Sequence, residues 1–327
     1  MYVLGIDGGG TKTIGVIVSS NGEVKGMATV GSTNMNSVGL NVVESEIKKL
    51  ISELKKHNLE AFNQISIIFA GMSGAGNAEN KRKLELILER IIGKDTSFFV
   101  DHDAITALYT GTYGKEGMVH ISGTGSIAYG MNRAGKRERV GGWGYLLGDH
   151  GSGFAVGQEA FMSLFDRYDQ GQNQTILDTF ILQHFSVKEP PEMVPIIYGE
   201  SDSRRLIASI VPFIFKAADE GDRNAQNILS HHATAIAENI YCLTQKLFSE
   251  AETQIPVVLT GGLFSREDWL VPTIKAYLES KNMKANLIIP TLPPVIGSVI
   301  GGYKMHEIEI NQDIIQRLEI FFINGSS

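Results

Sequence analysis

The stretch YVLGIDGGGTKT, residues 2–13, decides the fold expected for this chain of 327 residues. An apolar strand ends in Asp7, a glycine-rich turn follows, and a second strand rich in β-branched residues begins directly after it. Asn21-Gly22, a dipeptide typical of tight hairpins, then leads into a third strand at 24–30. The chain is therefore predicted to open with three antiparallel strands.

The same pattern returns in the middle of the chain. A strand at 118–122 runs into a second glycine-rich turn and then into another strand, so that GTGS at Gly123 repeats GGGT at Gly8. A weaker similarity relates FAG at 69–71 to LTG at 259–261, since each ends an apolar strand with glycine. Because the similar stretches occur in the same order in both halves of the chain, the sequence predicts a duplicated α/β fold.

Helical patterns separate these strands and dominate the second half. Apolar residues recur at helical spacing along 37–57. Further helices are expected at 79–92, 104–113, 154–168, 174–185, 205–220, 223–250, 267–280 and 312–321. We expect two domains: residues 1–115, joined by the C-terminal segment 305–327, and residues 116–304, which carry the helical insertions.

Charge and composition narrow the class of protein. Hydrophobic residues make up 43% of the chain, which suits a packed core, and the net charge is -7. An acidic chain is a poor match for a nucleic-acid backbone, which calls for a basic face. No apolar run approaches the ~20 residues of a membrane span, and the N-terminus MYVLGIDGGG lacks the pattern of a signal peptide. We expect a cytoplasmic protein without nucleic-acid or membrane partners.

The single cysteine, Cys242, bears on two chemistries. One cysteine forms no intramolecular disulfide and holds no iron–sulfur cluster within one chain. It follows Ile240 and Tyr241 and precedes Leu243 in a helical stretch. We therefore expect Cys242 to be buried as a small apolar residue.

Residues 7–13, DGGGTKT, combine groups that suit a bound phosphate. Glycines in a tight turn let backbone N–H groups approach an anion closely, and a carboxylate such as Asp7 suits hydrated Mg²⁺. Thr11, Lys12 and Thr13 add hydroxyl and ammonium donors. A hairpin turn without a ligand is the alternative, and the recurrence of a glycine-rich turn later in the chain makes it weaker. The chain has no GxxxxGK[ST] phosphate loop.

Three motifs in order carry a resemblance to a known superfamily. DGGGTKT at 7–13, ISGTGS at 121–126 and LTGG at 259–262 resemble the phosphate-1, phosphate-2 and adenosine motifs of the sugar kinase/heat-shock-70/actin superfamily. Within it the chain is most similar to the N-acetylglucosamine kinase branch of the BadF/BadG/BcrA/BcrD ATPase family. The stretches that carry this similarity are 32–34, 71–74, 103–104, 121–126 and 141–149.

The resemblance implies a fold, cofactors and a catalytic base. The fold is α/β, with two ribonuclease-H-like (actin-like ATPase) domains, ATP in an interdomain cleft and Mg²⁺ at Asp7. Asp103 is implied to be the general base that takes a proton from a sugar hydroxyl, with Asp101 as the second choice. The alternative role for Asp103 is to cap the helix that begins near Ala104. His102 is expected to be a neighbour with no part in the reaction.

The resemblance also implies which residues contact each ligand. On the nucleotide side they are Gly8, Gly9, Gly10, Thr11, Lys12, Thr13, Gly123, Thr124, Gly125, Ser209, Gly261 and Gly262. On the sugar side they are Asn34, Ser73, Gly74, Asp103, Gly142, Trp143, Gly144 and Asp149. Ordinary packing is an equal alternative for Trp143, and a turn position beside glycine is the alternative for Asp149.

An amino sugar is the expected small-molecule substrate. Phosphorylation of N-acetylglucosamine to its 6-phosphate is the first expectation. Three positions depart from the family pattern: Met35-Asn36 stands where an aromatic sugar contact is usual, Ile127 where some relatives have Asn, and His150 where Glu is usual. These departures keep N-acetylmuramic acid and glucosamine open as substrates.

Two other functions compete with the kinase. An ATPase activator of a radical enzyme shares the fold but needs cluster-binding cysteines, and the chain has one cysteine. A non-catalytic actin-like sugar sensor or filament former is the second rival, and ATP turnover stimulated by an amino sugar separates it from a kinase. We also expect a homodimer.

Overall fold

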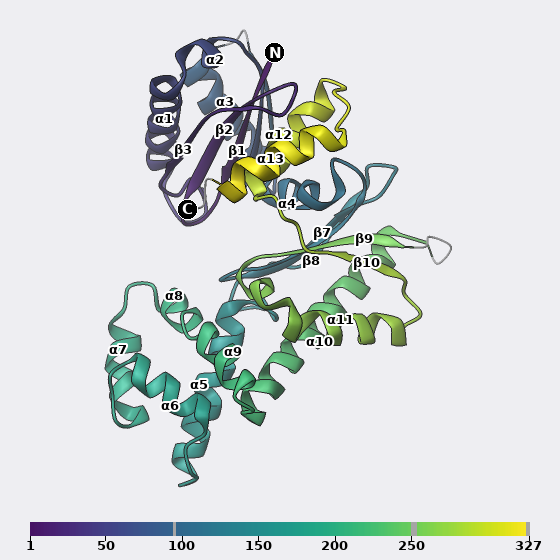
Figure 1. Ribbon diagram of the computed structural model, residues 1–327. Coiled ribbons are helices and arrows are strands. Elements are labelled where there is room, and N and C mark those ends of the chain that lie inside the picture. Colours follow the sequence, from purple (N-terminus) through teal and green to yellow (C-terminus); the bar gives the residue numbers. More distant parts are fainter. Residues whose placement is uncertain (94–95, 250–253, 325–327) are drawn as a thin grey trace. The chain divides into compact units, whose positions relative to one another are not determined.

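The computed structural model describes residues 1–93, 96–249 and 254–324, and the chain divides into two compact units (Figure 1). Unit 1 comprises Met1–Glu116 and Pro290–Ser327, and unit 2 comprises Gly117–Ile289. Unit 2 therefore ends earlier than the boundary at 304 that the sequence suggested. The reason is helix α12 (Pro294–Met305), which packs on the central strand of unit 1.

Unit 1 is built on a mixed sheet with the strand order β3-β2-β1-β4-β5. Its strands are β1 (Tyr2–Gly8), β2 (Thr13–Ser19), β3 (Val24–Val30), β4 (Ile65–Met72) and β5 (Ser97–His102). The first three are antiparallel as predicted, and β4 and β5 continue the sheet parallel to β1. Helices α1 (Leu40–His57) and α3 (Ala78–Ile92) cover one face, while α4 (Asp103–Thr112) and α12 cover the other (Figure 1).

Unit 2 repeats this arrangement strand for strand. Its sheet has the order β10-β9-β6-β7-β8. The strands are β6 (Gly117–Ser122), β7 (Ser126–Met131), β8 (Arg137–Gly141), β9 (Ile255–Thr260) and β10 (Ala285–Ile288). The strands β6, β7 and β8 are antiparallel, and β9 and β10 run parallel to β6. The duplication predicted from the two glycine-rich turns is thereby confirmed.

The remaining helices lie mostly in unit 2. They are α2 (Leu59–Asn63), α5 (Gly153–Asp169), α6 (Ile176–His184), α7 (Met193–Gly199), α8 (Ser203–Ala208), α9 (Val211–Asp219), α10 (Arg223–Leu247), α11 (Glu267–Ser280) and α13 (Gln312–Asn324). The sequence suggested one helix at 205–220, but the structure has two, because Pro212 lies in the first turn of α9. Proline disfavours a helical residue before it and lacks the N–H that a continuous helix needs. The last expected residue of the helix at 223–250 lies outside the described residues.

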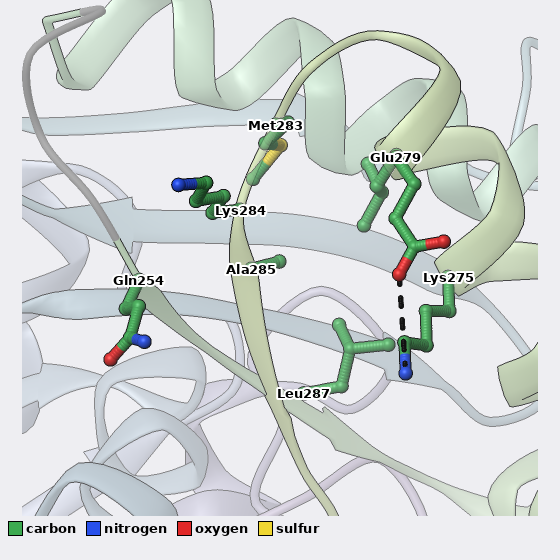
Figure 2. A pocket seen from close by; sticks show the side chains of 8 residues that line it. Gln254, Lys275, Glu279, Met283, Lys284, Ala285 and Leu287 are labelled. Atoms are coloured by element: carbon green, nitrogen blue, oxygen red, sulfur yellow. Dashed lines mark ion pairs between the residues drawn. The ribbon is translucent and has the colours of Figure 1, made fainter.

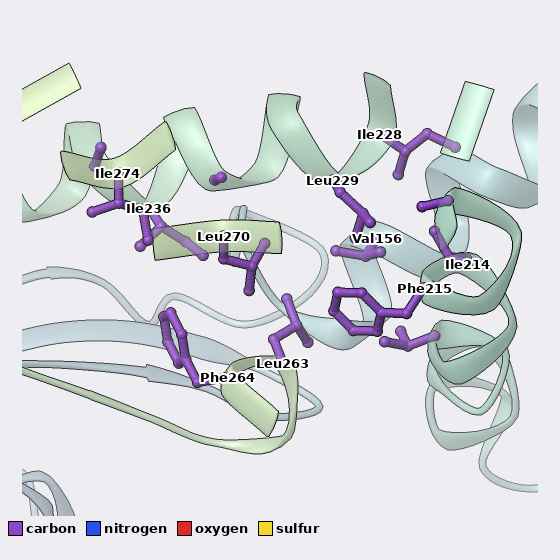
Figure 3. Close-up of a cluster of buried hydrophobic side chains, with 14 of the residues drawn as sticks. Val156, Ile214, Phe215, Ile228, Leu229, Ile236, Leu263, Phe264, Leu270 and Ile274 are labelled. Atoms are coloured by element: carbon purple, nitrogen blue, oxygen red, sulfur yellow. The ribbon is translucent and has the colours of Figure 1, made fainter. Parts of the chain in front are cut away.

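Unit 2 has its own apolar core between α5, α9, α10 and α11. Figure 3 shows Val156, Phe215, Leu229, Ile236 and Leu270 turned toward one another in this core. All five side chains are less than a twentieth exposed, so each contributes roughly 1.5–3 kcal/mol of apolar burial. Among the helices of the described ranges, none is long and apolar enough to cross a membrane.

The expectation that Cys242 is buried is wrong. Ile240 and Leu243 point into the core of unit 2, whereas the thiol of Cys242 is exposed on another face of α10. A helix turns about 100° per residue, so neighbours of core residues need not be core residues themselves. The argument against an iron–sulfur cluster therefore rests on the cysteine count alone.

Close backbone approach holds α4 in place on both of its sides. A Cβ atom on Gly71 of β4 would lie 2.2 Å from Cγ2 of Thr106, and one on Gly297 of α12 would lie 1.8 Å from the carbonyl oxygen of Thr106. Both contacts are possible only because glycine has no side chain. The helix that begins with Asp103 is thus clamped between a strand and a second helix.

Replacing Gly297 by alanine is expected to lower the unfolding temperature by roughly 3–10 °C, since overpacking of a core contact costs about 1–3 kcal/mol. Scanning calorimetry of the purified chain measures this. Gly199→Ala is the control, because Gly199 is also a helical glycine and a Cβ there meets no atom within 4 Å. Equal unfolding temperatures for the two variants would contradict the clamp.

Candidate functional site

The first glycine-rich turn is braced by the segment that follows β3. The N–H of Gly9 donates to the carbonyl of Lys12 at 3.0 Å, and the carbonyl of Gly9 accepts from Thr33 N–H at 3.3 Å and from Ser32 Oγ at 3.1 Å. A Cβ on Gly8 would lie 2.6 Å from the hydroxyl oxygen of Thr33. The turn is therefore a fixed backbone frame rather than a loose loop.

The side chains of this turn divide into two groups. Gly10, Thr11 and Lys12 are exposed at its tip, where a phosphate has access. Thr13 is fully buried and its hydroxyl forms a hydrogen bond with that of Thr33 at 2.8 Å. The hydroxyl of Thr13 therefore supports the turn, and the phosphate contact that the sequence suggested for Thr13 stays a prediction.

Three of the predicted sugar-side residues meet beside this turn. The N–H of Ser73 donates to the carbonyl of Gly8 at 2.7 Å, which ties the end of β4 to the end of β1. Gly74 has φ +90°, and a Cβ there would lie 3.0 Å from Oδ1 of Asn34. That oxygen accepts from Asn36 N–H at 2.9 Å, which orients the Asn34 amide. Phosphate-side and sugar-side candidates are thus neighbours within unit 1.

The strand register brings the carboxylates of Asp7, Asp101 and Asp103 to the same edge of the unit 1 sheet. Asp7 pairs with Gly71, and Gly71 pairs with Asp101, so the carboxyl ends of β1, β4 and β5 lie in one row. Asp103 follows two residues after Asp101, as the first residue of α4. Burial and, to a lesser extent, the charge of Asp103 raise the pKa of Asp7 to about 7 against the opposing effect of Lys12.

A divalent cation fits this arrangement. Two neighbouring carboxylates that repel each other, one of them desolvated, form the kind of oxygen-donor set that Mg²⁺ prefers. A perturbed carboxyl beside a glycine turn is also a feature that marks functional sites. The carboxylate of Asp7 therefore suits a metal ion, and both the metal and its site at Asp7 stay predictions.

The helix cap at Asp103 differs from the expected one. His102, rather than Asp103, caps α4: its Nδ1 lies 3.1 Å from Ala104 N–H and 2.8 Å from Oδ1 of Asp103. A neutral Nδ1 without a proton accepts from Ala104, whereas a protonated Nδ1 donates to Asp103. His102 thus contacts the predicted base directly, and sequence reasoning treated it as a bystander because nothing in a single His shows its partner.

The second glycine-rich turn is braced by the start of α5. The N–H of Gly153 donates to the carbonyl of Gly123 at 2.7 Å, and that of Phe154 donates to the carbonyl of Thr124 at 3.3 Å. Gly123 N–H closes the turn on the carbonyl of Gly125 at 2.9 Å. Thr124 and Gly125 are exposed at the tip, as Thr11 and Gly10 are in unit 1.

The adenosine motif lies beside this turn. Gly261 has φ +105°, and a Cβ there would lie 2.3 Å from the carbonyl oxygen of Ser122. Strand packing therefore already requires glycine at 261, whether or not a nucleotide passes there. Gly262 follows as the first residue of a short 3₁₀ helix, Gly262–Arg266, and is exposed.

Ser209 lies at the C-terminal end of α8. Its hydroxyl donates to the carbonyl of Leu206 at 2.7 Å and lies 3.2 Å from Nε2 of His184. The preceding residue, Ala208, approaches within 3.6 Å of a Cβ position on Gly153. The end of α8 is thereby linked to the segment that braces Gly123, and Ser209 stays a nucleotide-side prediction.

A hydrogen-bonded arginine fixes the loop after β8. Gly141, Gly142 and Gly144 all have positive φ, and the Trp143 between them is 61% exposed. The guanidinium of Arg139 stacks 3.9 Å from the centroid of the Trp143 ring and donates to the carbonyl of Gly142 at 2.9 Å. An indole held in place yet exposed is better suited to a ligand contact than to core packing. Sequence reasoning missed Arg139.

Asp149 is a buried carboxylate beside the second turn of unit 2. It is 8% exposed with φ +64°, and its Oδ1 accepts from Gly144 N–H at 3.2 Å. Burial raises the pKa of Asp149, and the N–H groups of Gly144 and Ser126, which donate to it, oppose that shift. The carboxylate therefore joins the Trp143 loop to the second turn, which supports the alternative of a structural turn residue alongside the predicted sugar contact.

A recessed surface elsewhere in unit 2 lies apart from these residues. Figure 2 shows Gln254, Lys275, Glu279, Lys284 and Leu287 around it, between α11 and β10. None of the predicted site residues lines this recess. Its size alone therefore does not make it the functional site.

A comparison with known protein families covers almost the whole chain. The description of the matching family is the BadF/BadG/BcrA/BcrD ATPase family, and the match extends over residues 4–302. The chain belongs to this family. Membership confirms the resemblance that the three motifs carried, and residues 7–13, 121–126 and 259–262 all fall inside the matched range.

Two relatives of this chain carry the names of sugar kinases. The N-acetyl-D-glucosamine kinase of Dictyostelium discoideum is 31% identical over 306 residues, which cover 91% of this chain and 96% of the relative. The N-acetylmuramic acid/N-acetylglucosamine kinase of Clostridium acetobutylicum is 30% identical over 303 residues, which cover 91% and 97%. The family member described here thus aligns with whole kinases of amino sugars.

A solved structure supports the fold assignment. A protein from Chromobacterium violaceum that carries the provisional name N-acetylglucosamine kinase matches with a TM-score of 0.70 at 23% identity, covering 91% of this chain and 98% of that one. At this identity the likeness concerns the fold alone. Each unit of this BadF/BadG/BcrA/BcrD family member is an actin-like ATPase unit, as the sequence predicted.

Replacing Asp7 by asparagine is expected to stabilise the metal-free protein, more at pH 8 than at pH 5. The pKa of Asp7 is raised in the folded state, so the unfolded state binds fewer protons and stability falls as pH rises from about 4 to about 7. Asparagine removes this penalty, which reaches roughly 2–4 kcal/mol above pH 7. Urea unfolding with a chelator present measures the gap between variant and wild type.

The second carboxylate provides the control for this prediction. In an Asp103→Asn background the gap is expected to shrink, because one source of the raised pKa is gone. A gap between Asp7→Asn and wild type that is the same at pH 5 and pH 8 would contradict the arrangement.

Proposed function

We propose that this chain is an ATP-dependent kinase that phosphorylates an amino sugar. The observation that carries the proposal is the pair of carboxylates, Asp7 and Asp103, at one sheet edge beside the glycine turn. Phosphoryl transfer needs a cation held near the phosphates and a separate base for the attacking hydroxyl, and two carboxylates in unlike environments suit these roles. The names of the relatives point to the same reaction class.

Asp103 is proposed as the general base. It accepts the proton of the sugar hydroxyl as the hydroxyl oxygen attacks the γ-phosphorus, and the bond from that phosphorus to the bridging oxygen of ATP breaks to release ADP. The proton then passes from Asp103 to solvent. Mg²⁺, when bound at Asp7, would neutralise negative charge on the phosphates. Nδ1 of His102 lies 2.8 Å from Oδ1 of Asp103 and, when it carries a proton, donates to that carboxylate.

The remaining assignments follow the geometry within each unit. In unit 1 the tip residues Gly10, Thr11 and Lys12 are proposed to bind phosphate through backbone N–H groups and the ammonium. Asn34, Ser73 and Gly74 are proposed to contact the sugar. In unit 2 the proposed nucleotide contacts are Gly123, Thr124, Gly125, Ser209, Gly261 and Gly262, and the proposed sugar contacts are Gly142, Trp143, Gly144 and Asp149.

N-acetylglucosamine, phosphorylated at carbon 6, is the first candidate substrate. Ile127 supports a tolerant pocket, because its side chain lies against Gly142 within the proposed sugar loop and offers no hydrogen bond there. A site that does not demand a polar contact discriminates weakly between related substrates. N-acetylmuramic acid and glucosamine are therefore proposed as alternative substrates, and the homodimer stays a prediction.

A coupled assay of ADP release over a panel of hexoses, hexosamines and N-acetylated amino sugars tests the proposal. We expect turnover with N-acetylglucosamine well above the rate with glucose or without sugar. ATP hydrolysis at the same rate with and without every sugar would contradict a kinase and favour an ATPase activator. No turnover of N-acetylmuramic acid would remove that sugar alone.

Changing Asp103 to asparagine is expected to lower kcat by roughly 10²–10⁴-fold, the usual contribution of a general base. Binding of the sugar and of ATP, measured by calorimetry, is expected to persist because the amide keeps the shape of the side chain. Asp101→Asn is the matched comparison, since Asp101 pairs in the sheet two residues away. If Asp101→Asn loses the activity and Asp103→Asn keeps it, the roles are reversed.

A further inference from the structure

A buried histidine outside the predicted site contacts one of its loops. His232 on α10 is 2% exposed, and its Nδ1 accepts from the N–H of Gly151 at 3.2 Å. Its Nε2 faces Oε2 of Glu159 on α5 at 3.0 Å. The three groups form a chain from a carboxylate through an imidazole to a backbone N–H, all within unit 2.

The direction of the Gly151 hydrogen bond fixes the proton on His232. A neutral imidazole carries one N–H, so an accepting Nδ1 places the proton on Nε2, which lies 3.0 Å from Oε2 of Glu159 without an aligned hydrogen bond. Burial acts to raise the pKa of Glu159, but the neighbouring His232 and His231 bring it below its usual value. Glu159 is therefore ionised at neutral pH and favours the tautomer that Gly151 needs.

Gly151 belongs to the segment that links the two loops of unit 2. Asp149 lies two residues before it, and Gly153, which braces the carbonyl of Gly123 at 2.7 Å, lies two residues after it. Gly151 has φ +79°, and a Cβ there would lie 2.4 Å from Cγ1 of Ile236. Ile236 sits one turn beyond His232 on α10 and points into the core (Figure 3). The segment is thus pressed onto α10 at Gly151.

We infer that Glu159 and His232 are positioning residues that hold the N–H of Gly151 and thereby set Asp149 in the sugar loop. The inference rests on the proposed function, because only that function makes Asp149 a contact of the sugar. Neither residue touches a reacting atom. Their effect passes through the backbone of residues 149–153 and acts on how tightly the sugar binds rather than on the chemical step.

A metal site is the rival explanation for this cluster. Ligand atoms of Glu159, His231 and His232 lie within 4.8 Å of one another. A cation on Nε2 of His232 would move the proton to Nδ1, where it would face the N–H of Gly151, and two donors would then oppose each other. The Gly151 hydrogen bond therefore favours the positioning pair.

Two substitutions of His232 separate its nitrogens. Asparagine places an amide oxygen near the position of Nδ1 and keeps an acceptor for Gly151, while glutamine places an amide N–H near Nε2 and keeps only the contact with Glu159. We expect His232→Gln to raise the sugar KM roughly three- to tenfold, the factor that one ordinary hydrogen bond represents. The kcat of His232→Gln and its KM for ATP are expected to stay within about twofold of wild type. For His232→Asn, kcat and both KM values are expected to stay within about twofold of wild type.

Amide hydrogen exchange gives a readout that does not depend on activity. Faster exchange of residues 149–153 in His232→Gln but not in His232→Asn supports the inference even if no sugar in the panel is turned over, so failure of the proposed function is distinguished. Equal exchange and equal kinetic constants for the two variants would overturn it. A stoichiometric metal found in the purified protein by elemental analysis, and lost in both variants, would overturn it in favour of a metal site.

Discussion

The register of β1, β4 and β5 is the constraint on which the candidate site of unit 1 depends. Parallel strands end at the same edge, so pairing Asp7 with Gly71 and Gly71 with Asp101 brings the ends of three distant segments together. Gly71 also lets α4 approach the sheet closely enough for Asp103 to lie near Asp7. A slip of one residue would turn these side chains to the opposite face.

The two units use buried carboxylates in different ways. Asp7 is half-buried beside a second carboxylate, so its environment disfavours its charge and raises its pKa to about 7. Asp149 is also buried, but backbone N–H groups of Gly144 and Ser126 donate to it and offset part of the desolvation. Asp7 has few hydrogen-bond donors around it, so its charge would be stabilised by a bound cation. Asp149 already accepts from backbone N–H groups, so it can hold the loops in place.

The loops of unit 2 depend on contacts with other segments, and two of these segments lie far away in the chain. Gly153 braces the turn at Gly123, Arg139 holds Trp143, and His232 on α10 holds Gly151. Backbone with positive φ is costly for most residues, so such loops persist where tertiary contacts specify them. Their glycines allow close approach, and the polar side chains from helices and strands then set the geometry.

The sequence by itself determined the duplicated sheets, the two glycine-rich turns and the family. Strand patterns, turn residues and short motifs are local features, so they can be recognised in short stretches of sequence. It also placed Asp7 and Asp103 at strand ends. Only the tertiary structure decided that Thr13 is buried, that Cys242 is exposed, and that α12 belongs with unit 1.

The same holds for the partners of the site residues. His102 caps α4, Arg139 stacks on Trp143, and His232 meets Gly151 from the far side of a long helix. The physical reason is that a side chain's burial and hydrogen bonds depend on which face of its element meets which neighbour. That is a property of the three-dimensional packing, and the pattern of residue types along the chain does not show it.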